Sequence, residues 1–203
     1  MLCLSVRANE KVFQQQTLMC KTYTTDRLLL RQWKDADRRE FTEINNDPDV
    51  MRYFPQRYTS EDSNRFVDQN LTLIANEGWG AWAVELIEST TFIGFVGFSI
   101  PAQWHPCANH IDIGWRLGKD HWGYGYATEA ARFSLRIGFT SLGFNKLVSY
   151  TSECNLPSIN VMSKIGMFDD GIGFEHPRIE VTSPLRKHVV YRLSKSQWQA
   201  KNA

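Results

Sequence analysis

Three features that would direct a chain to a membrane or to nucleic acid are missing from this sequence. No run of apolar residues approaches the roughly 20 that a membrane-spanning helix needs. The apolar start, Met1–Leu4, is too short for the core of a signal peptide. Lysine plus arginine number 23 against 22 for aspartate plus glutamate, so no excess of positive charge indicates nucleic acid as the main partner. These absences predict a cytoplasmic protein without membrane or nucleic-acid partners.

The four cysteines form no metal-binding or disulfide motif. None is spaced as Cys-x-x-Cys, and no neighbouring histidine completes a zinc pattern. We therefore expect no metal site, and free thiols in a reducing compartment, at Cys3, Cys20, Cys107 and Cys154. Cys154 is also a candidate nucleophile, although no histidine lies near it in the sequence to activate it.

The composition is that of one folded domain. With 203 residues, 42% of them hydrophobic and 13% aromatic, the chain is long and apolar enough to bury a core. No repeat, linker or low-complexity tract divides it. We expect an N-terminal extension over residues 1–22, either a disordered tail or a docked arm, and a single domain over residues 23–203.

Periodicity and capping residues predict a mixed α+β order. Residues 26–31 form the expected first strand, which is followed by a helix capped by Asp35 and a second helix capped at Thr59. Alternating apolar residues predict a hairpin over residues 79–100 and a further strand over residues 111–117. A helix, a strand, a helix and closing strands complete the order.

The strand at 111–117 leads into the most informative stretch of the chain, a glycine-containing loop followed at once by a helix. Glycines at such a turn let backbone N–H groups face outward together, with the positive end of the helix dipole behind them. The loop therefore predicts a cradle for a phosphate or pyrophosphate, formed by Trp122, Gly123, Tyr124, Gly125, Tyr126 and Ala127. Two other phosphate-binding motifs are excluded. A Walker loop needs Lys-Ser or Lys-Thr after its last glycine, where this chain has Tyr126-Ala127. A dinucleotide fingerprint needs Gly-x-Gly-x-x-Gly near the start of a domain, whereas this loop lies past the middle of the chain.

Two blocks of the sequence resemble motifs of the GNAT superfamily of N-acetyltransferases. The glycine loop is similar to the family's pyrophosphate motif, Arg/Gln-x-x-Gly-x-Gly/Ala, but Trp122 replaces the first residue, a form typical of the RimJ/RimL-like branch. Residues 155–167 resemble the family's Asn-x-x-Ser block, which ends in Gly-Phe/Met. Residues 184–193 resemble a closing strand, so the resemblance extends over residues 25–193.

The resemblance implies a fold and a co-substrate. The fold is a mixed α+β one, in which a central mixed sheet is splayed between its fourth and fifth strands and flanked by helices, with the pantetheine arm of acetyl-CoA in the split. Main-chain groups of Trp115, Arg116 and Leu117 would pair with that arm as another strand would. The loop N–H groups would hold the pyrophosphate, and the Thr128 hydroxyl would add a contact. Asn155 would bond the pantetheine arm, cap its own helix, or do both.

Amine acetylation also needs a base for the attacking amine and an acid for the leaving thiolate. Many relatives in the family place a tyrosine where this chain has Met162, which cannot donate a proton. By the same resemblance Ser158 is the candidate acid, and its alternative role is a supplementary helix cap. Asp112, where the branch usually carries glutamate, is the candidate base, and its alternative role is a carboxylate bonded to backbone. Glu85 and Glu153 are further candidates for the base.

Aromatic residues are assigned to the core or to the acceptor side of the site. The core is the expected place for Trp79, Trp82, Trp104 and Trp115, and the substrate cleft is the alternative. Residues 53–55, Tyr-Phe-Pro, lie where the family builds the wall of its acceptor site, and simple helix packing is the alternative.

The residues and the resemblance together predict an acetyl-CoA-dependent N-acetyltransferase. The acceptor would be a primary amine of a protein N-terminus, an amino acid or a small molecule, attacking directly in a ternary complex formed by a monomer or a homodimer. A non-catalytic acyl-CoA-binding module that keeps the loop is the alternative, and Met162 favours it. A nucleotide-binding protein would need a lysine or an acidic ribose contact that the loop does not provide.

Overall fold

A nine-stranded mixed sheet organises residues 22–202, the part of the chain that this computed structural model describes. Its strands are β1 (Tyr23–Thr24), β2 (Leu28–Arg31), β3 (Ala81–Leu86), β4 (Phe92–Ser99), β5 (Ile111–Leu117), β6 (Lys146–Ser152), β7 (Phe168–Asp169), β8 (Phe174–Glu175) and β9 (Lys187–Ser194). Their order is β1-β2-β3-β4-β5-β6-β9-β7, and β8 pairs with β9. The predicted N-terminal extension, residues 1–22, lies outside the described residues except for Thr22, and so do Cys3 and Cys20.

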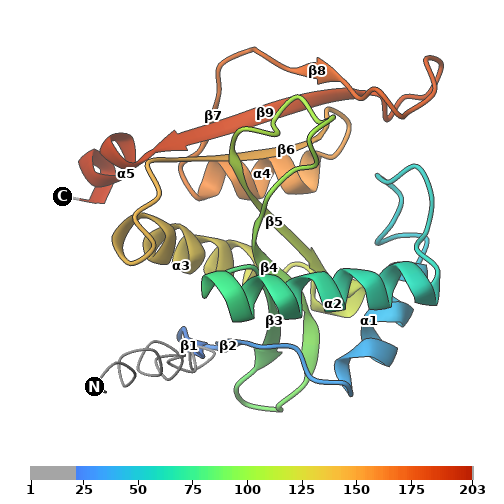
Figure 1. The fold of residues 1–203 in the computed structure, drawn as a ribbon, viewed down its shortest axis with the longest axis vertical. Helices are drawn as coiled ribbons and strands as arrows, with labels where there is room; N and C mark the ends of the chain where they lie inside the picture. The colour runs from blue at the N-terminus through green and yellow to red at the C-terminus, as the bar shows by residue number, and fades with distance from the viewer. Residues whose placement is uncertain (1–21, 203) are drawn as a thin grey trace, which may run out of the picture.

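Helices pack on this sheet and connect its strands. They are α1 (Asp37–Asn46), α2 (Ser60–Glu77), the single 3₁₀ turn Lys119–His121, α3 (Tyr126–Thr140), α4 (Leu156–Lys164) and α5 (Lys195–Asn202). Helices α1 and α2 pack against each other, α3 packs on β4 and β5, and α4 packs on β6. In Figure 1, α2 crosses in front of β3 and β4, while α4 lies beside β6 and β9. The alternation of strands and helices is the predicted mixed α+β order.

The sheet splits between β5 and β6. These two strands run parallel, and they pair only at Ile111 with Leu147 and at Asp112 with Val148. Every other pair of neighbouring strands within residues 22–202 is antiparallel. Since β1 adds one short strand at the start, β5 and β6 are the fourth and fifth strands of the predicted order. The predicted fold class, including the position of the splay, is confirmed.

One of the two predicted helix caps is confirmed and the other is wrong. The Thr59 hydroxyl accepts a hydrogen bond from the Asp62 N–H at 3.1 Å, and the Asp62 carboxylate accepts one from the Thr59 N–H at 3.0 Å, so α2 begins with a capping box. Asp35 does not cap α1. Instead the Asp37 carboxylate, inside the first turn, accepts a hydrogen bond from the Lys34 N–H at 2.7 Å. The N-cap position is Ala36, and no side chain caps the first turn of α1.

The tryptophans divide between the core and the surface. Trp79 and Trp82 are buried, as predicted, and both rings contact the edge of the Phe98 ring. The prediction for Trp104 is wrong, because its side chain is 41% exposed. The Arg178 guanidinium lies 3.9 Å from the centre of the Trp104 ring. A cation–π contact of this kind stabilises an indole at the surface without core packing.

Candidate functional site

The open edge of β5 forms one wall of a cavity of about 620 Å³. Because β6 diverges after Asp112, no strand in the described chain pairs with residues 113–117 on that side. Residues of β6 and α4 line the facing wall, and the segment 47–59 between α1 and α2 contributes a third wall. Trp115, Arg116 and Leu117, whose main chain was predicted to pair with a pantetheine arm, all line this cavity.

The glycine loop closes one end of the cavity. Gly123 and Gly125 both adopt φ of 83°, a left-handed conformation that strongly favours glycine. Gly125 is the N-cap of α3 and supplies no side chain, so the first N–H groups of the helix have no side-chain cap. Every predicted loop residue lines the cavity except Tyr124, which is 61% exposed and stacks on the Tyr126 ring. Thr128, in the first turn of α3, lines it as well.

Contacts that the sequence did not indicate fix this loop in place. The Arg27 guanidinium donates to the Tyr124 carbonyl at 3.0 Å and to the Glu129 carboxylate at 2.7 Å. The Trp122 indole N–H donates to the Leu117 carbonyl at 2.9 Å, which ties the loop back to β5. Arg27 is about a hundred positions from its partners, so spacing in the sequence gave no signal for this brace.

Seven residues of the second motif line the cavity from α4 and its N-cap, among them Asn155, Ser158 and Met162. The buried Asn155 accepts a hydrogen bond from the Ser158 N–H at 3.3 Å and donates to the Thr151 hydroxyl at 2.8 Å, so its predicted role as a cap is confirmed. Ser158 is half-buried, and within residues 22–202 its hydroxyl makes no hydrogen bond. The supplementary cap expected of that hydroxyl is therefore not formed. Met162 is buried in the same wall.

Asp112 lies on β5 where the two halves of the sheet part, and it lines the cavity. Its carboxylate accepts a hydrogen bond from the hydroxyl of Ser99, its cross-strand neighbour, at 3.2 Å. Burial raises the pKa of Asp112 from 3.8 to about 7, although the Ser99 hydrogen bond opposes the shift. A carboxyl group with such a pKa is partly ionised at neutral pH and can accept a proton.

The other two candidate bases do not reach the cavity. Glu85 is buried, but its carboxylate is bonded to Arg31 at 2.7 Å and to Lys34 at 3.0 Å, and it does not line the cavity. Glu153 is exposed and forms an ion pair with Lys187 at 2.8 Å, also outside the cavity lining. Both carboxylates are engaged in ion pairs, so among the three candidates only Asp112 faces the cavity.

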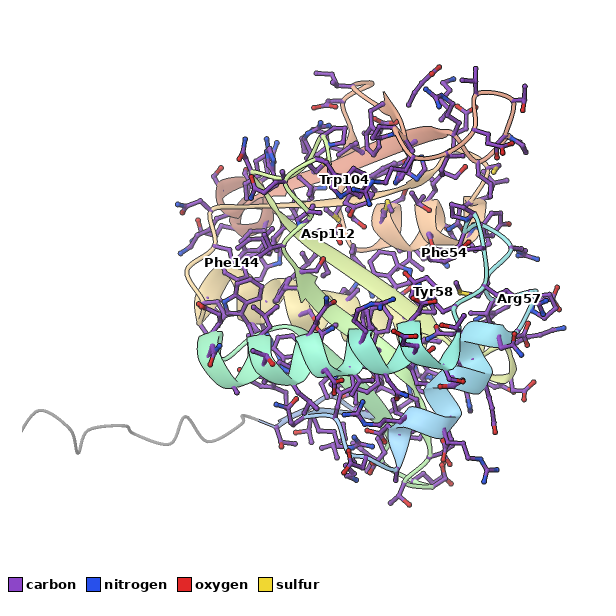
Figure 2. The ribbon with its side chains drawn as sticks, turned by 45° about the vertical axis from the view of Figure 1, so that its right-hand side comes forward. Phe54, Arg57, Tyr58, Trp104, Asp112 and Phe144 are labelled. Carbon is purple, nitrogen blue, oxygen red and sulfur yellow. The ribbon has the colours of Figure 1, made fainter. Side chains whose placement is uncertain are left out.

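The side chain of Arg116 is a functional candidate that the sequence reasoning missed. Its guanidinium donates to the Asn45 amide oxygen at 2.5 Å and lies 4.3 Å from the Phe54 ring centre and 4.7 Å from that of Tyr58. In Figure 2, Phe54 and Tyr58 lie on the inner side of the segment 47–59, while Arg57 lies at the outer rim. The alternation of residues along β5 places Arg116 on the same face as Asp112, and this signal could have identified it.

Other predicted or excluded features concern thiols, metals and membranes. The Cys154 thiol is exposed, lies outside the cavity lining and contacts the Ser152 hydroxyl at 3.1 Å. Across residues 22–202 no three side chains of the types His, Cys, Asp and Glu gather in a way that could hold a metal ion. The same part of the chain has no helix that combines the length and apolarity a membrane crossing requires.

Known proteins are similar to this chain in sequence and in fold. The uncharacterized N-acetyltransferase YnaD of Bacillus subtilis (strain 168) is 32% identical over 149 residues, which are 73% of this chain and 83% of that protein. The FsC-acetyl coenzyme A-N(2)-transacetylase of Aspergillus fumigatus is 30% identical over 175 residues, with 80% of this chain and 72% of that protein covered. The crystal structure of a GNAT-family acetyltransferase from Bacillus anthracis superposes with a TM-score of 0.71 at 28% identity. That superposition covers 87% of this chain and 99% of the other.

The family match covers the site and most of the sheet. Residues 27–168 match the family model described as the acetyltransferase (GNAT) domain. This range includes the split between β5 and β6, the glycine loop and the Asn155 helix. The fold observed around the cavity is the one that the resemblance in the sequence implied. The chain belongs to the GNAT family of acetyltransferases and is an N-acetyltransferase.

Proposed function

We propose that this enzyme transfers the acetyl group of acetyl-CoA to a primary amine by direct attack in a ternary complex. The observation that carries the proposal is the continuity of one cavity, which the open β5 edge, the glycine loop and the cap of α4 all line. The pantetheine arm pairs with the main chain of residues 115–117 as an added strand, and the N–H groups of residues 123–127 hold the pyrophosphate. Thr128 and Asn155 add polar contacts to the cofactor.

Two side chains are assigned to proton transfer. The amine nitrogen attacks the thioester carbonyl carbon, and a C–N bond forms as the C–S bond breaks. Asp112 takes the proton of the attacking amine, directly or through a water, because its pKa of about 7 suits a base at neutral pH. Ser158, whose hydroxyl has no partner among the described residues, donates a proton to the CoA sulfur.

The proposed acceptor is an amine because the relatives are named as N-acetyltransferases, and one is named for transfer to an N(2) position. The form Trp122-Gly123-Tyr124-Gly125 supports assignment to the RimJ/RimL-like branch. A non-catalytic acyl-CoA-binding module is less consistent with the site. Such a module needs neither a carboxylate with a pKa near neutrality nor an unbonded hydroxyl at the cavity.

A matched pair of glycine variants tests cofactor binding at the loop. Gly125→Val places a branched side chain where the backbone must approach the pyrophosphate, and should weaken acetyl-CoA binding at least tenfold, about 1.4 kcal/mol, by calorimetry. Gly143→Val is the control, because Gly143 has φ of 72° and open space around it but lies outside the cavity lining. It carries the same backbone strain and should bind acetyl-CoA normally. Equal affinities in two folded variants would remove the loop from the site.

A further inference from the structure

Arg116 is a buried cation without a counter-charge. Its side chain is only 7% exposed. No carboxylate within residues 22–202 forms an ion pair with it, and its polar partners there are the amide oxygen of Asn45 and the phenol group of Tyr58. The Nε atom is buried without any hydrogen-bond partner. A buried guanidinium left in this state is costly unless something else neutralises it.

The contacts of Arg116 leave the Nε–H group of the guanidinium unpaired within residues 22–202. The centres of the Phe54, Tyr58 and Phe95 rings lie within 5.8 Å of its central carbon, close enough for cation–π contacts. One terminal nitrogen, Nη1, donates to Asn45. The Nε–H group has no partner among residues 22–202, and with Nη2 it forms the edge of a guanidinium that a carboxylate can bind with two parallel hydrogen bonds.

The same face of the sheet links this cation to the proposed base. In the β4–β5 register, Phe95 pairs with Arg116, Gly97 with Gly114, and Ser99 with Asp112. On this face of β4 and β5, the positions between the cation and the carboxylate are therefore both glycines, which have no side chain. A Cβ placed on Gly114 would have a single neighbour within 4 Å, the Asp112 carboxylate oxygen at 3.6 Å. Asp112 and Arg116 line the two ends of one open strip of the cavity, about 13 Å apart along β5 at Cα.

We propose that Arg116 binds a carboxylate of the acceptor, so that the acceptor is an amine that also carries a carboxylate, as amino acids do. The inference rests on the proposed function, in which the amine of the acceptor meets Asp112. The carboxylate then lies against the Nε and Nη2 edge of the Arg116 guanidinium, beside the aromatic rings of the segment 47–59. A polyamine would place positive charge beside Arg116, and like charges at a desolvated contact are strongly disfavoured.

Matched pairs of acceptors test the inference by kinetics. Free amino acids, with their amine on the α-carbon or further along the side chain, are compared with the same compounds as carboxamides, using thiol release from saturating acetyl-CoA. We expect kcat/KM to be at least 10²-fold higher for the preferred acid than for its amide, since the amide leaves the buried cation unpaired. In Arg116→Met this ratio should fall toward one. The control is Arg57→Met, which removes an exposed guanidinium of the segment 47–59 that does not line the cavity, and here the ratio should stay unchanged.

The outcomes that overturn the inference differ from those that overturn the proposed function. Efficient transfer to spermidine, to amides or to peptide N-termini, without any preference that depends on Arg116, overturns the carboxylate site and leaves acetyl transfer intact. A ratio that is unaffected by Arg116→Met overturns it as well. Loss of thermal stability in Arg116→Met with the ratio preserved would assign Arg116 to support of the segment 47–59 alone.

A second measurement does not depend on turnover. In ¹⁵N-labelled protein loaded with CoA, the Nε–H signal of Arg116 is identified by its loss in Arg116→Met and followed during titration with each acid and its amide. The inference predicts a shift with the acid and none with the amide at the same concentration. A shift without any acetyl transfer would contradict the proposed function and keep the carboxylate site. Absence of a shift with every acid in the panel would overturn the inference.

Discussion

Two arginines of this sheet are buried to the same extent and are treated in opposite ways. Arg31 on β2 is 6% exposed, and Arg116 on β5 is 7% exposed. The Arg31 guanidinium donates to both oxygens of Asp37, at 2.7 and 2.8 Å, and to Glu85 at 2.7 Å. Arg116 has the amide oxygen of Asn45 and aromatic rings, but no carboxylate among the described residues. At equal burial, Arg31 is therefore neutralised by two carboxylates, while Arg116 has no carboxylate partner within residues 22–202.

The carboxylates near these arginines show the same contrast. Burial opposes ionisation of Glu85, but hydrogen bonds from Arg31 and Lys34 outweigh it and hold the pKa of Glu85 below its usual value. Asp112 has only the Ser99 hydroxyl, so burial raises its pKa to about 7. A carboxylate committed to an ion pair stabilises the fold, while one held near its titration point can exchange a proton. Partner identity, rather than burial, separates the structural charges from those assigned to chemistry.

The largest expected effect comes from opening the closed cluster. Arg31→Met leaves the carboxylates of Asp37 and Glu85 buried without their cation, and should cost about 3–5 kcal/mol of unfolding free energy. Arg116→Met leaves behind uncharged partners, the amide oxygen of Asn45 and the phenol group of Tyr58, rather than buried carboxylates, and should change stability by no more than about 1 kcal/mol. Urea unfolding of both variants measures the difference. Comparable losses of unfolding free energy in the two variants would mean that both arginines stabilise the fold to the same extent.

Removing the proposed base should impair catalysis without this structural damage. Asp112→Asn should lower turnover by about 10²- to 10³-fold, the range expected for a placed base. Since the ionised carboxylate accepts the proton, kcat/KM of the wild-type enzyme should rise with pH through about 7, and this limb should vanish in the variant. Ser99→Ala removes the hydrogen bond that opposes the shift, so it should move the limb to higher pH. Normal turnover with an unchanged pH profile in Asp112→Asn would place the base elsewhere.

On α4, the Ser158 hydroxyl makes no hydrogen bond within residues 22–202, in contrast to the Asn155 side chain at the start of that helix. Ser158→Ala should leave acetyl-CoA affinity nearly intact and lower turnover by roughly 10²-fold, the lower end of what a placed acid contributes. Thiol release at saturating acetyl-CoA provides the measurement. Near-normal turnover would assign the proton to water or to another residue.

The neighbouring Asn155 is fully bonded and should behave as a structural and binding residue. Asn155→Ala removes a helix cap worth about 1 kcal/mol, which thermal or urea unfolding can detect. It should also raise the Michaelis constant for acetyl-CoA while changing turnover less than Ser158→Ala does. A variant with normal stability and a normal Michaelis constant would show that the side chain contributes to neither.

The sequence predicted those features of the fold and of the site that local spacing determines. The glycine loop, the Thr59 capping box and the Asn155 cap depend on residues a few positions apart, and all three are present. The role of Arg116 depends on Asn45, which is 71 positions away. Glu85 was misassigned as a candidate base because its partner Arg31 lies 54 positions away, and no local pattern reveals that pair. Contacts between elements that are distant in the sequence determine which charged side chains have a partner of opposite charge, and local patterns do not reveal these contacts.

Acetyl transfer in the cavity beside β5 can be tested directly. The direct test incubates the wild-type protein with acetyl-CoA and a panel of free amino acids, carboxamides, peptides and polyamines, and measures released thiol together with acetylated amine by mass spectrometry. We expect equal amounts of the two products, less of both with Asp112→Asn, and the highest activity with amines that carry a carboxylate. Tight acetyl-CoA binding with no thiol release from any amine would contradict this expectation, and would make the protein a non-catalytic acyl-CoA-binding module.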